Sequence, residues 1–300
     1  MQKRNNIIIG DLIIDQNYLI KHSGKSAEFN SKKFILINKS FNLGGAGMVY
    51  EGLKKLDKNT LFFTVSSYKY KNVFSKLKIQ KKIFFGKKLI IEKKRYWEKN
   101  KLNYQLNKIN LSKIDIHKFQ TKFLNNVNKI QSFSNIIFCD YRYGIFTTNF
   151  TKKIIKIFKK KNCVIYVDQQ CTSISPDLMK YKNSDYLILN KKEFEMAFNI
   201  YDIKGKLLNK LNKLQKILNI SCFVIKTGPQ GCSIFQNNKL IKSKVPKKIN
   251  KYLNTIGAGD YFLANFVYKK NQNINQRINS SNNYAFMKII GKSKIRNINF

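Results

Sequence analysis

The sequence predicts a layered α/β fold with a mainly parallel central β-sheet, and two observations lead to this prediction. Short apolar runs typical of buried strands alternate with segments of helical periodicity along the whole chain. This alternation is typical of βαβ units, in which helices cover both faces of a parallel sheet. The chain also has 300 residues and 43% hydrophobic content, which is enough for one large α/β domain with a substantial core.

The first half of the chain begins with strands, and two of them are expected to leave the main sheet. The expected elements are a strand at 7–15, a strand at 33–38, a helix at 44–56, a strand at 61–65, a β-hairpin at 83–97 turning at 86–88, and a helix at 114–130. Segments 18–22 and 34–38 are short strands with polar flanks, and they suit a small flap over the edge of the sheet.

The second half alternates more regularly. Its expected elements are strands at 135–140, 163–168, 186–190 and 222–226, helices at 148–160, 191–198, 203–218, 257–268 and 280–290, and a hairpin over 232–242 that turns at Asn237-Asn238. The chain has three prolines, no internal repeat and no low-complexity linker. We therefore expect a single domain over residues 1–300, with small lid strands within 16–40 and 83–110.

The charge of the chain is extreme, because 58 basic residues face only 16 acidic ones and give a net charge of +42. Nucleic-acid binding is one interpretation of such a charge. The lysines are, however, spread over expected helices, loops and strand ends, and Lys, Asn, Ile, Phe and Tyr all have AT-rich codons. Compositional drift is the favoured interpretation, so we expect no specific nucleic-acid partner and only weak, salt-sensitive binding of polyanions.

Cysteines and apolar runs bear on the compartment. The five cysteines are odd in number and show no CxxC spacing, so a disulfide framework is not expected and a reducing, cytoplasmic setting fits. The two histidines lie far apart in the sequence and give little support to a zinc site. No apolar run approaches the roughly 20 residues of a membrane span, so no membrane association is expected.

The segment Asn254–Asp260 (NTIGAGD) contains the strongest chemical signal. Small residues Gly257, Ala258 and Gly259 open an apolar helix, where free N–H groups and the helix dipole favour an anion. Asp260 follows directly and could accept a proton from a substrate hydroxyl. Charge stabilisation and a base are what phosphoryl transfer requires. The alternative is that Asp260 merely caps the helix or occupies its first turn.

This segment resembles the signature of the ribokinase-like (PfkB) carbohydrate kinases, whose usual form is Asp-Thr-x-Gly-Ala-Gly-Asp. Four further matches follow the chain order of that family: Gly10-Asp11 with Asp15, Leu43–Gly47, Asn190–Glu193 and Lys226–Gly231. Together the matches cover nearly the whole chain. The resemblance implies a ribokinase-like three-layer α/β fold with a mainly parallel central sheet and a small β flap, or lid. It also implies ATP and Mg²⁺ as cofactors.

The first two matches are implied to bind the sugar. Asp11 and Asp15 lie four residues apart at a strand end, so both could face one crevice and bind vicinal hydroxyls. Gly44 and Gly45 could let the backbone press against the sugar. The alternatives are two solvent-facing acids in a loop, and a tight turn that simply starts a helix.

The last two matches are implied to bind the nucleotide. Glu193 and Asn190 could hold water around a magnesium ion near the phosphates, or they could form only a helix-capping pair. Lys226, Thr227, Gly228 and Gly231 match the nucleotide loop of the family. Asn283, in the last expected helix, is also assigned to the nucleotide by this resemblance.

Within the family, the chain resembles the heptose-7-phosphate kinase branch in segments 10–19, 93–106, 139–144 and 167–170. The phosphate of such a substrate needs cations, and Arg95 with Lys93 or Lys94 are candidates, although they could be ordinary surface bases. Several residues depart from the branch: Met48 replaces an Asn, Asn254 an Asp, Tyr143 and Gln170 each a Lys, Gln105 an Arg and Asn107 an Asp.

The function predicted from these patterns is ATP-dependent phosphorylation of a hydroxyl of a sugar or sugar phosphate, with C1 of heptose 7-phosphate as the candidate position. The departures put the sugar-recognition residues in doubt, and Asn254 puts a monovalent-cation site in doubt. The alternative is therefore a catalytically weakened sugar-binding or regulatory protein on the same fold. The family resemblance also suggests a homodimer formed through the flap strands.

Overall fold

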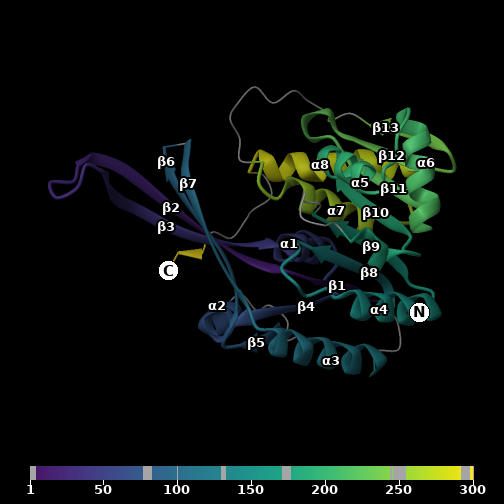
Figure 1. The fold of residues 1–300 in the computed structure, drawn as a ribbon, viewed down its shortest axis with the longest axis horizontal. Coiled ribbons are helices and arrows are strands. Elements are labelled where there is room, and N and C mark those ends of the chain that lie inside the picture. Colours follow the sequence, from purple (N-terminus) through teal and green to yellow (C-terminus); the bar gives the residue numbers. More distant parts are fainter. Residues whose placement is uncertain are drawn as a thin grey trace.

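The computed structural model describes residues 5–76, 83–99, 101–129, 133–170, 177–243, 245, 255–291 and 298–299. Within these ranges, a central sheet runs through the body of the molecule (Figure 1). Its strands lie in the order β13 (Lys239–Ser243), β12 (Cys232–Gln236), β11 (Cys222–Lys226), β10 (Tyr186–Asn190), β9 (Val164–Gln169), β8 (Phe133–Asp140), β1 (Asn5–Gly10), β4 (Thr60–Ser67) and β5 (Ile83–Gly86). The pairs from β11 to β5 are parallel, whereas β12 and β13 run antiparallel.

Helices cover both faces of this sheet, which confirms the predicted α/β fold with a mainly parallel sheet (Figure 1). One face carries α1 (Ala46–Leu56), α2 (Lys71–Lys76), α7 (Ala258–Tyr268) and α8 (Ile274–Ile289). The other face carries α3 (Lys113–Lys129), α4 (Thr148–Lys160), α5 (Lys191–Ile200) and α6 (Leu207–Leu218). In the described part of the chain, three short 3₁₀ helices connect these elements: η1 (Tyr68–Tyr70), η2 (Leu178–Tyr181) and η3 (Gly228–Gln230).

The core consists of two apolar layers, one on each face of the central sheet. Strand β1 shows how one sequence serves both layers, because successive side chains of a strand point to opposite faces. Ile7 and Ile9 pack into the layer beneath α3 and α4, while Ile8 packs into the layer beneath α1 and α7. Strands buried on both faces need continuous apolar runs, which is why β1, β8 and β10 are readable from the sequence.

A second sheet forms the lid and projects from the body as a long arm (Figure 1). Its strands lie in the order β14 (Ile298–Asn299), β3 (Lys32–Gly45), β2 (Leu12–Lys25), β6 (Leu89–Glu98) and β7 (Lys101–Leu111). The predicted flap is therefore confirmed, but it is larger than expected. Strands β2 and β3 pair from Leu12↔Gly45 at the base to Lys25↔Lys32 near the tip.

Two predicted elements near the N-terminus need correction. The strand expected at 7–15 is divided at Asp11, where the chain leaves the central sheet as β1 and enters the lid as β2. The helix expected from Gly44 begins at Ala46, because Gly44 and Gly45 end strand β3. Gly45 has φ 58° and ψ −134°, a conformation that cannot belong to a helix.

The hairpin predicted over 83–97 is wrong. β5 joins the central sheet beside β4, with Val65 opposite Phe84, whereas β6 joins the lid beside β2. The turn at 86–88 thus carries the chain from one sheet to the other, and the hairpin is formed by β6 and β7.

Two helices also start elsewhere than predicted, since α6 begins at Leu207 and α8 begins at Ile274. The side chain of Asn273 caps α8 by accepting the Gln276 N–H at 3.0 Å.

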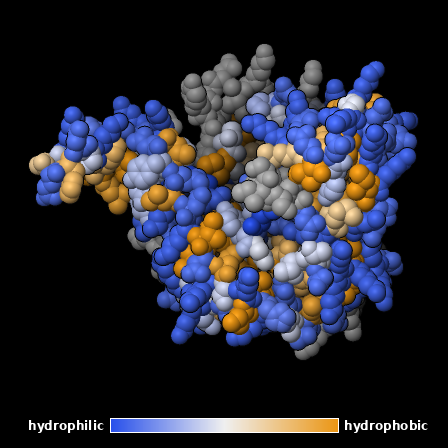
Figure 2. Space-filling view, viewed as in Figure 1, coloured by the Kyte–Doolittle hydropathy of each residue, from blue (hydrophilic) through white to orange (hydrophobic). Residues whose placement is uncertain are grey.

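On the face shown in Figure 2, the surface is mainly hydrophilic over both the body and the projecting arm, with small hydrophobic groups between. This agrees with lysines spread along the whole chain. Among the described helices, none has both the length and the apolar character that crossing a membrane requires.

The expected hairpin through Asn237 and Asn238 is confirmed, and both residues adopt the positive φ of a tight hairpin turn (50° and 58°).

The core predicts a large difference between two equivalent substitutions. Phe158→Ala removes a fully buried ring of α4 and should lower the free energy of unfolding by about 3–5 kcal/mol. Phe29→Ala, at the tip of the arm where the ring is 70% exposed, should change it by less than about 0.5 kcal/mol. Urea denaturation of both variants measures this difference, and similar losses in both would contradict the assigned core.

Candidate active site

Charged side chains gather where the carboxyl ends of the parallel strands meet the base of the lid. Asp11 follows β1, Asp140 ends β8, Asp168 lies near the end of β9, and Lys226 ends β11. Helix α7 adds Asp260 from its first turn. Ligands of open α/β sheets bind at this edge, because loops and helix N-termini converge there.

Asp260 is half-buried and accepts a hydrogen bond from the hydroxyl of Tyr141 at 2.5 Å. Burial raises the pKa of Asp260 to about 6, and the negative charge of Asp168 adds to the rise, whereas the Tyr141 hydrogen bond and Lys226 lower it. A carboxylate with a pKa near 6 is ionised at neutral pH and still basic enough to accept a hydroxyl proton. The geometry therefore suits the base predicted from the sequence.

The glycines before Asp260 create the space and the backbone geometry at the start of α7. Gly257 adopts φ 83° and ψ 0°, the left-handed conformation that favours glycine, and the helix begins at Ala258. The N–H group of Ala258 donates to the carbonyl of Thr255 at 3.1 Å. Of the three predicted anion-binding amides, that of Ala258 is therefore already engaged. The first-turn amides of a helix otherwise have no acceptor within the helix.

Lys226 and Asp168 form an ion pair across the intervening strand β10. The Lys226 Nζ lies 3.1 Å from Oδ1 and 3.0 Å from Oδ2 of Asp168. A Cβ atom added to Gly259 would lie only 3.6 Å from this Nζ, so the ammonium group sits directly beside the start of α7. Lys226 was predicted to bind the nucleotide, and the structure brings it next to the glycine segment.

Asp11 is completely buried, and its Oδ2 accepts the backbone N–H groups of Tyr141 at 2.8 Å and Tyr143 at 3.3 Å. Burial and the neighbouring charge of Asp140 raise the pKa of Asp11, although the two amides and Lys180 oppose this rise. Its Oδ1 has no hydrogen-bond partner within the described part of the chain. This atom is a candidate acceptor for a substrate hydroxyl.

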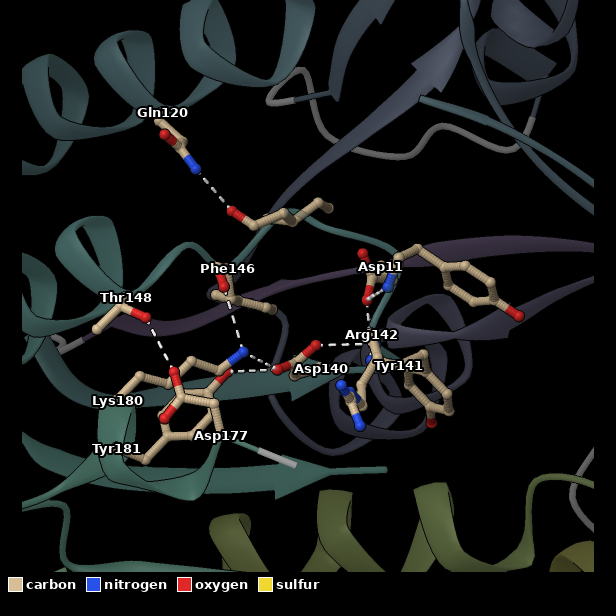
Figure 3. Close-up of polar contacts among 12 residues, drawn as sticks. Asp11, Gln120, Asp140, Tyr141, Arg142, Phe146, Thr148, Asp177, Lys180 and Tyr181 are labelled. Carbon is tan, nitrogen blue, oxygen red and sulfur yellow. Dashed lines mark hydrogen bonds and ion pairs between the residues drawn. The ribbon is translucent and has the colours of Figure 1, made fainter. Parts of the chain in front are cut away.

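The loop that holds Asp11 is itself fixed by a buried network around Asp140 (Figure 3). Lys180 donates to Asp140 Oδ2 at 2.7 Å and to the Phe146 carbonyl at 3.2 Å, and the Tyr181 hydroxyl donates to the same Oδ2 at 3.0 Å. The backbone N–H of Arg142 donates to Asp140 Oδ1 at 2.8 Å. A buried carboxylate needs this set of partners, and the result is a rigid segment beneath the site.

Asp15 and Arg95 were both predicted to contact the substrate, and the structure pairs them with each other. Arg95 Nη1 lies 2.9 Å from Asp15 Oδ1, and Arg95 Nε donates to Gln105 at 3.0 Å. Both partners are largely buried. Burial raises the pKa of Asp15, while Arg95 and Lys93 oppose the rise. Arg95 thus anchors an acid of β2 to the lid strand β6.

Gly44 lies against Asp15, and Gly45 lies against Asp11. A Cβ atom on Gly44 would clash with Oδ2 of Asp15, and one on Gly45 would lie 2.6 Å from the Asp11 carbonyl oxygen. Gly45 also has a positive φ of 58°. Contact of these glycines with a sugar stays a prediction, and in this structure the groups that lie against them are Asp11 and Asp15.

Asn190 and Glu193 form a capping box at the start of α5. The Glu193 N–H donates to Asn190 Oδ1 at 2.9 Å, and the Asn190 N–H donates to Glu193 Oε2 at 2.7 Å. The capping alternative is therefore confirmed, and it also fixes the position of the Glu193 carboxylate. The charge of this carboxylate acts on Lys226, which places it at the same end of the sheet as the glycine segment.

The predicted nucleotide loop is a tight turn between β11 and β12. The N–H and hydroxyl of Thr227 both donate to the Gly231 carbonyl, at 2.9 and 2.8 Å, and the Gly231 N–H donates to Gly228 at 3.0 Å. Gly228 and Gly231 both have positive φ, at 61° and 95°, which explains the two glycines. Asn283 is exposed on α8.

Four of the six residues that depart from the heptose branch lie around these groups. Met48 packs against Gly257, since a Cβ on Gly257 would lie 2.9–3.0 Å from three atoms of the Met48 side chain. Tyr143 is half-buried, and burial followed by the charges of Asp11 and Asp15 raises the pKa of its hydroxyl. Gln105 links Arg95 to Asn107, to which it donates at 2.9 Å. Asn254 lies outside the described residues.

Sequence reasoning did not select Tyr141, Asp140 and Asp168 as site residues. Each was visible as a polar residue at or just after the end of an apolar strand, in the segments CDYRYG and VDQQ. That position was the available signal, because side chains there face the binding edge of the sheet. Their partners are distant in the sequence and could not be assigned from it.

Known proteins resemble this chain over most of its length. The family model described as pfkB family carbohydrate kinase matches residues 5–278. The bifunctional protein HldE of Aliarcobacter butzleri is 32% identical over 97% of this chain and 62% of its own length. HldE of Campylobacter jejuni is 27% identical over 88% of this chain and 56% of its own length. The chain thus spans about three-fifths of the length of these relatives.

Solved structures show the same architecture. Ribokinase from Thermotoga maritima superposes with a TM-score of 0.75 at 15% identity, over 96% of this chain and 93% of that one. Phosphofructokinase-2 from Escherichia coli, solved with fructose-6-phosphate, gives 0.73 at 14% identity, over 96% and 94%. These likenesses confirm the predicted ribokinase-like fold. Together with the match over residues 5–278, they show that this chain belongs to the pfkB family of carbohydrate kinases.

Proposed function

We propose that the chain catalyses ATP-dependent phosphorylation of a hydroxyl group on a sugar or sugar phosphate. The observation that carries this proposal is the placement of Asp260 in the first turn of a glycine-opened helix, at the carboxyl edge of a parallel sheet. Its pKa of about 6 makes it an ionised base at neutral pH. Membership of the carbohydrate kinase family supports the same reaction.

In the proposed reaction, Asp260 takes the proton of the acceptor hydroxyl. The hydroxyl oxygen forms a bond to the terminal phosphorus of ATP as the bond from that phosphorus to the bridging oxygen breaks, and ADP leaves. The amides of Gly257 and Gly259 and the dipole of α7 stabilise the charge on the transferring group. Asp11 Oδ1 accepts a hydrogen bond from a second hydroxyl and so orients the sugar.

Mg²⁺ is proposed as the metal cofactor, because in phosphoryl transfer it bridges phosphate oxygens and neutralises their charge. Within the described residues, no three His, Cys, Asp or Glu side chains converge into a direct metal site. Mg²⁺ keeps several waters and needs only one or two carboxylates, so this donor set is compatible with a hydrated ion. Glu193, fixed by its capping box, would hold such an ion through water.

A sugar phosphate is the proposed acceptor, with heptose 7-phosphate as the first candidate. The identity with HldE proteins over most of this chain supports that class. Lys93 lies on β6 two residues before Arg95, and its charge acts on both Asp15 and Asp260. An ammonium group near the acceptor site suits a phosphate on the acceptor. Arg95, already bound to Asp15, would support this site by holding that acid in place.

An ADP-release assay over heptose, hexose and pentose phosphates, with Asp260→Asn as the test variant, examines the proposed reaction. We expect one acceptor class to support turnover, and Asp260→Asn to lower kcat by about 10²- to 10⁴-fold because the base is lost. Asp202→Asn, a control with the same charge change at a surface acid whose side chain is 81% exposed, should leave kcat unchanged.

Two results of this assay would count against the proposal. Unchanged turnover in Asp260→Asn would show that Asp260 is not the base of the reaction. Binding of a sugar phosphate by calorimetry, without ADP release from any acceptor, would favour the weakened sugar-binding protein. The packing of Met48 against Gly257 is the observation that keeps this second candidate open, because an apolar side chain replaces a polar group there.

The pH dependence of kcat/KM should report the titration of Asp260. Since only the carboxylate accepts a proton, kcat/KM should rise with pH through about 6 and level off above it. Tyr141→Phe removes a hydrogen bond that lowers the pKa of Asp260, so the acidic limb should move to higher pH. Tyr268→Phe, at an exposed position of the same helix, is the control. If the acidic limb of Tyr141→Phe lies at the same pH as that of the native chain, the titration of Asp260 does not determine the pH dependence of kcat/KM.

The lid is proposed to form a homodimer interface. Apolar side chains are more than half exposed on its strands, at Ile35, Leu36, Ile37, Leu106 and Ile109. Hydrophobic groups are visible on the projecting arm in Figure 2. Tyr104 stacks on Tyr96, with ring centroids 4.3 Å apart, and Leu106 follows two residues later on the same strand. The exposed apolar side chains of these strands are the observation that supports this interface.

Light scattering coupled to size exclusion tests the dimer. The native chain should have twice the monomer mass of 35.2 kDa, and Leu106→Asp should shift it to the monomer because it places a charge in the interface. Leu207→Asp, an exposed leucine in α6 far from the lid, should leave the dimer intact. A monomeric native chain would refute the proposed interface.

A further inference from the structure

Two buried acids, Asp11 and Asp140, share the amides of one tight turn after β8. Asp140 Oδ1 accepts the backbone N–H of Arg142 at 2.8 Å. Asp11 Oδ2 accepts the backbone N–H groups on either side of it, that of Tyr141 at 2.8 Å and that of Tyr143 at 3.3 Å. Three successive amides thus alternate between two carboxylates. The turn therefore holds two like charges next to each other inside the protein, where both acids are almost completely buried.

This arrangement costs free energy in two ways. Arg142 adopts a positive φ of 65°, which is uncommon for a residue with a side chain. The two negative charges also repel each other, and little water is present to screen them. Burial and, next, the charge of Asp140 raise the pKa of Asp11. Without a cation nearby, one of the two acids would therefore bind a proton at neutral pH.

Lys180, on η2, supplies a positive charge to this pair. Its Nζ lies 2.7 Å from Asp140 Oδ2 and donates to the Phe146 carbonyl at 3.2 Å, and its side chain is only 9% exposed. In Figure 3, Asp140 lies between this lysine and the turn that holds Asp11. The charge of Lys180 lowers the pKa of Asp11 and so opposes the repulsion from Asp140.

Among the described residues, the other side chains that titrate beside Asp11 carry no charge at neutral pH. Burial raises the pKa of each of them, and they are Cys139 in β8, Tyr143 in the turn and Tyr181 in η2. Gly45 and Ala46, which lie against the Asp11 carbonyl, bring no titratable side chain. The charge state of Asp11 therefore depends on the balance between Asp140 and Lys180.

We propose that Lys180 is a positioning residue for the acceptor: its ammonium group keeps both carboxylates ionised, so that Asp11 Oδ1 can accept a hydrogen bond from an acceptor hydroxyl. This inference rests on the proposed kinase function and deepens it. An ionised carboxylate only accepts hydrogen bonds, whereas a protonated one carries a donor in place of an acceptor. The same turn also carries Tyr141, whose hydroxyl donates to Asp260 at 2.5 Å. If Lys180 only maintained the shape of the turn, its loss would disturb Asp260 as well.

Three variants separate the charge of Lys180 from the shape of the turn. Lys180→Met removes the cation and leaves two facing acids, so the pKa of Asp11 should rise. Asp140→Asn removes the repelling acid and keeps an oxygen for the Arg142 N–H, so the pKa of Asp11 should fall. Lys180→Met/Asp140→Asn leaves no unpaired buried ion of the pair, and its Asp11 pKa should lie between these two. Comparison of this double variant with Asp140→Asn measures the effect of the lysine charge even if Lys180→Met does not fold.

NMR of the side-chain carboxyl carbons, in protein labelled with carbon-13 aspartate, measures these titrations without any ligand. The signals of Asp11 and Asp260 are assigned from their Asn variants. We expect the titration midpoint of Asp11 to move to higher pH in Lys180→Met and to lower pH in Asp140→Asn, while that of Asp260 stays in place. Lys182→Met, at an exposed position two residues after Lys180, is the matched control and should move neither midpoint.

Steady-state kinetics with the acceptor that the ADP-release assay selects complete the test. In Lys180→Met, the KM for this acceptor should rise roughly 10- to 100-fold at neutral pH, because a hydrogen bond to a charged group is lost. The KM should recover as the pH is raised, since Asp11 then ionises again. The kcat at saturating acceptor should stay close to that of the native chain, because Asp260 is unchanged.

The outcomes distinguish this inference from the proposed function. If the Asp11 midpoint is the same in Lys180→Met as in the native chain, or the same in Asp140→Asn as in the double variant, the role of Lys180 is refuted and the kinase function stands. Equal movement of the Asp11 and Asp260 midpoints would also refute it, because the turn would then have lost its shape. If the native chain turns over no acceptor, the proposed function fails, and the NMR titration still decides whether Lys180 keeps Asp11 ionised.

Discussion

The fold depends on how a single buried residue, Asp11, joins four parts of the structure. Its backbone N–H donates to Cys139 in β8 at 3.1 Å, and its carbonyl accepts the Ala46 N–H that starts α1 at 3.0 Å. Its side chain accepts two amides from the loop after β8. The chain passes here from the central sheet to the lid. The same residue that changes the direction of the chain also presents a carboxylate to the site.

Much of the fold could be predicted, because buried parallel strands need continuous apolar runs and amphipathic helices need a regular apolar stripe. The errors occur where the chain passes between sheets. The apolar segments at 83–86 and 89–97 are compatible with a hairpin by local pattern. In the folded protein, the first segment pairs with β4 in the central sheet and the second pairs with β2 in the lid. Both pairings join residues that are distant in the sequence, so the local pattern does not reveal them.

The residues of the candidate site also fall into two groups, those that a local motif predicts and those that only the fold brings together. Gly257, Gly259 and Asp260 follow one another, so a local motif was enough to find them. The pairing of Lys226 with Asp168 and of Asp15 with Arg95 joins residues on different strands, and no local pattern specifies it. Each of these pairs satisfies a largely buried charge, which is a constraint of the folded protein and not of any segment. The role of Glu193 was ambiguous in the sequence because one carboxylate can cap a helix and still serve a second ligand.

The scarcity of acids in this chain has a consequence for which substitutions it tolerates. Only 16 residues are Asp or Glu, and among the described residues five of them are buried: Asp11, Asp15, Glu92, Asp140 and Asp168. All five lie at the carboxyl edge of the sheet or in the adjoining lid strands. Lysines have accumulated over the hydrophilic surface, where one charge more or less is screened by water and salt. We therefore expect the chain to tolerate substitutions of its surface lysines. Substitution of any of the five buried acids should be poorly tolerated, because no other acid can replace it.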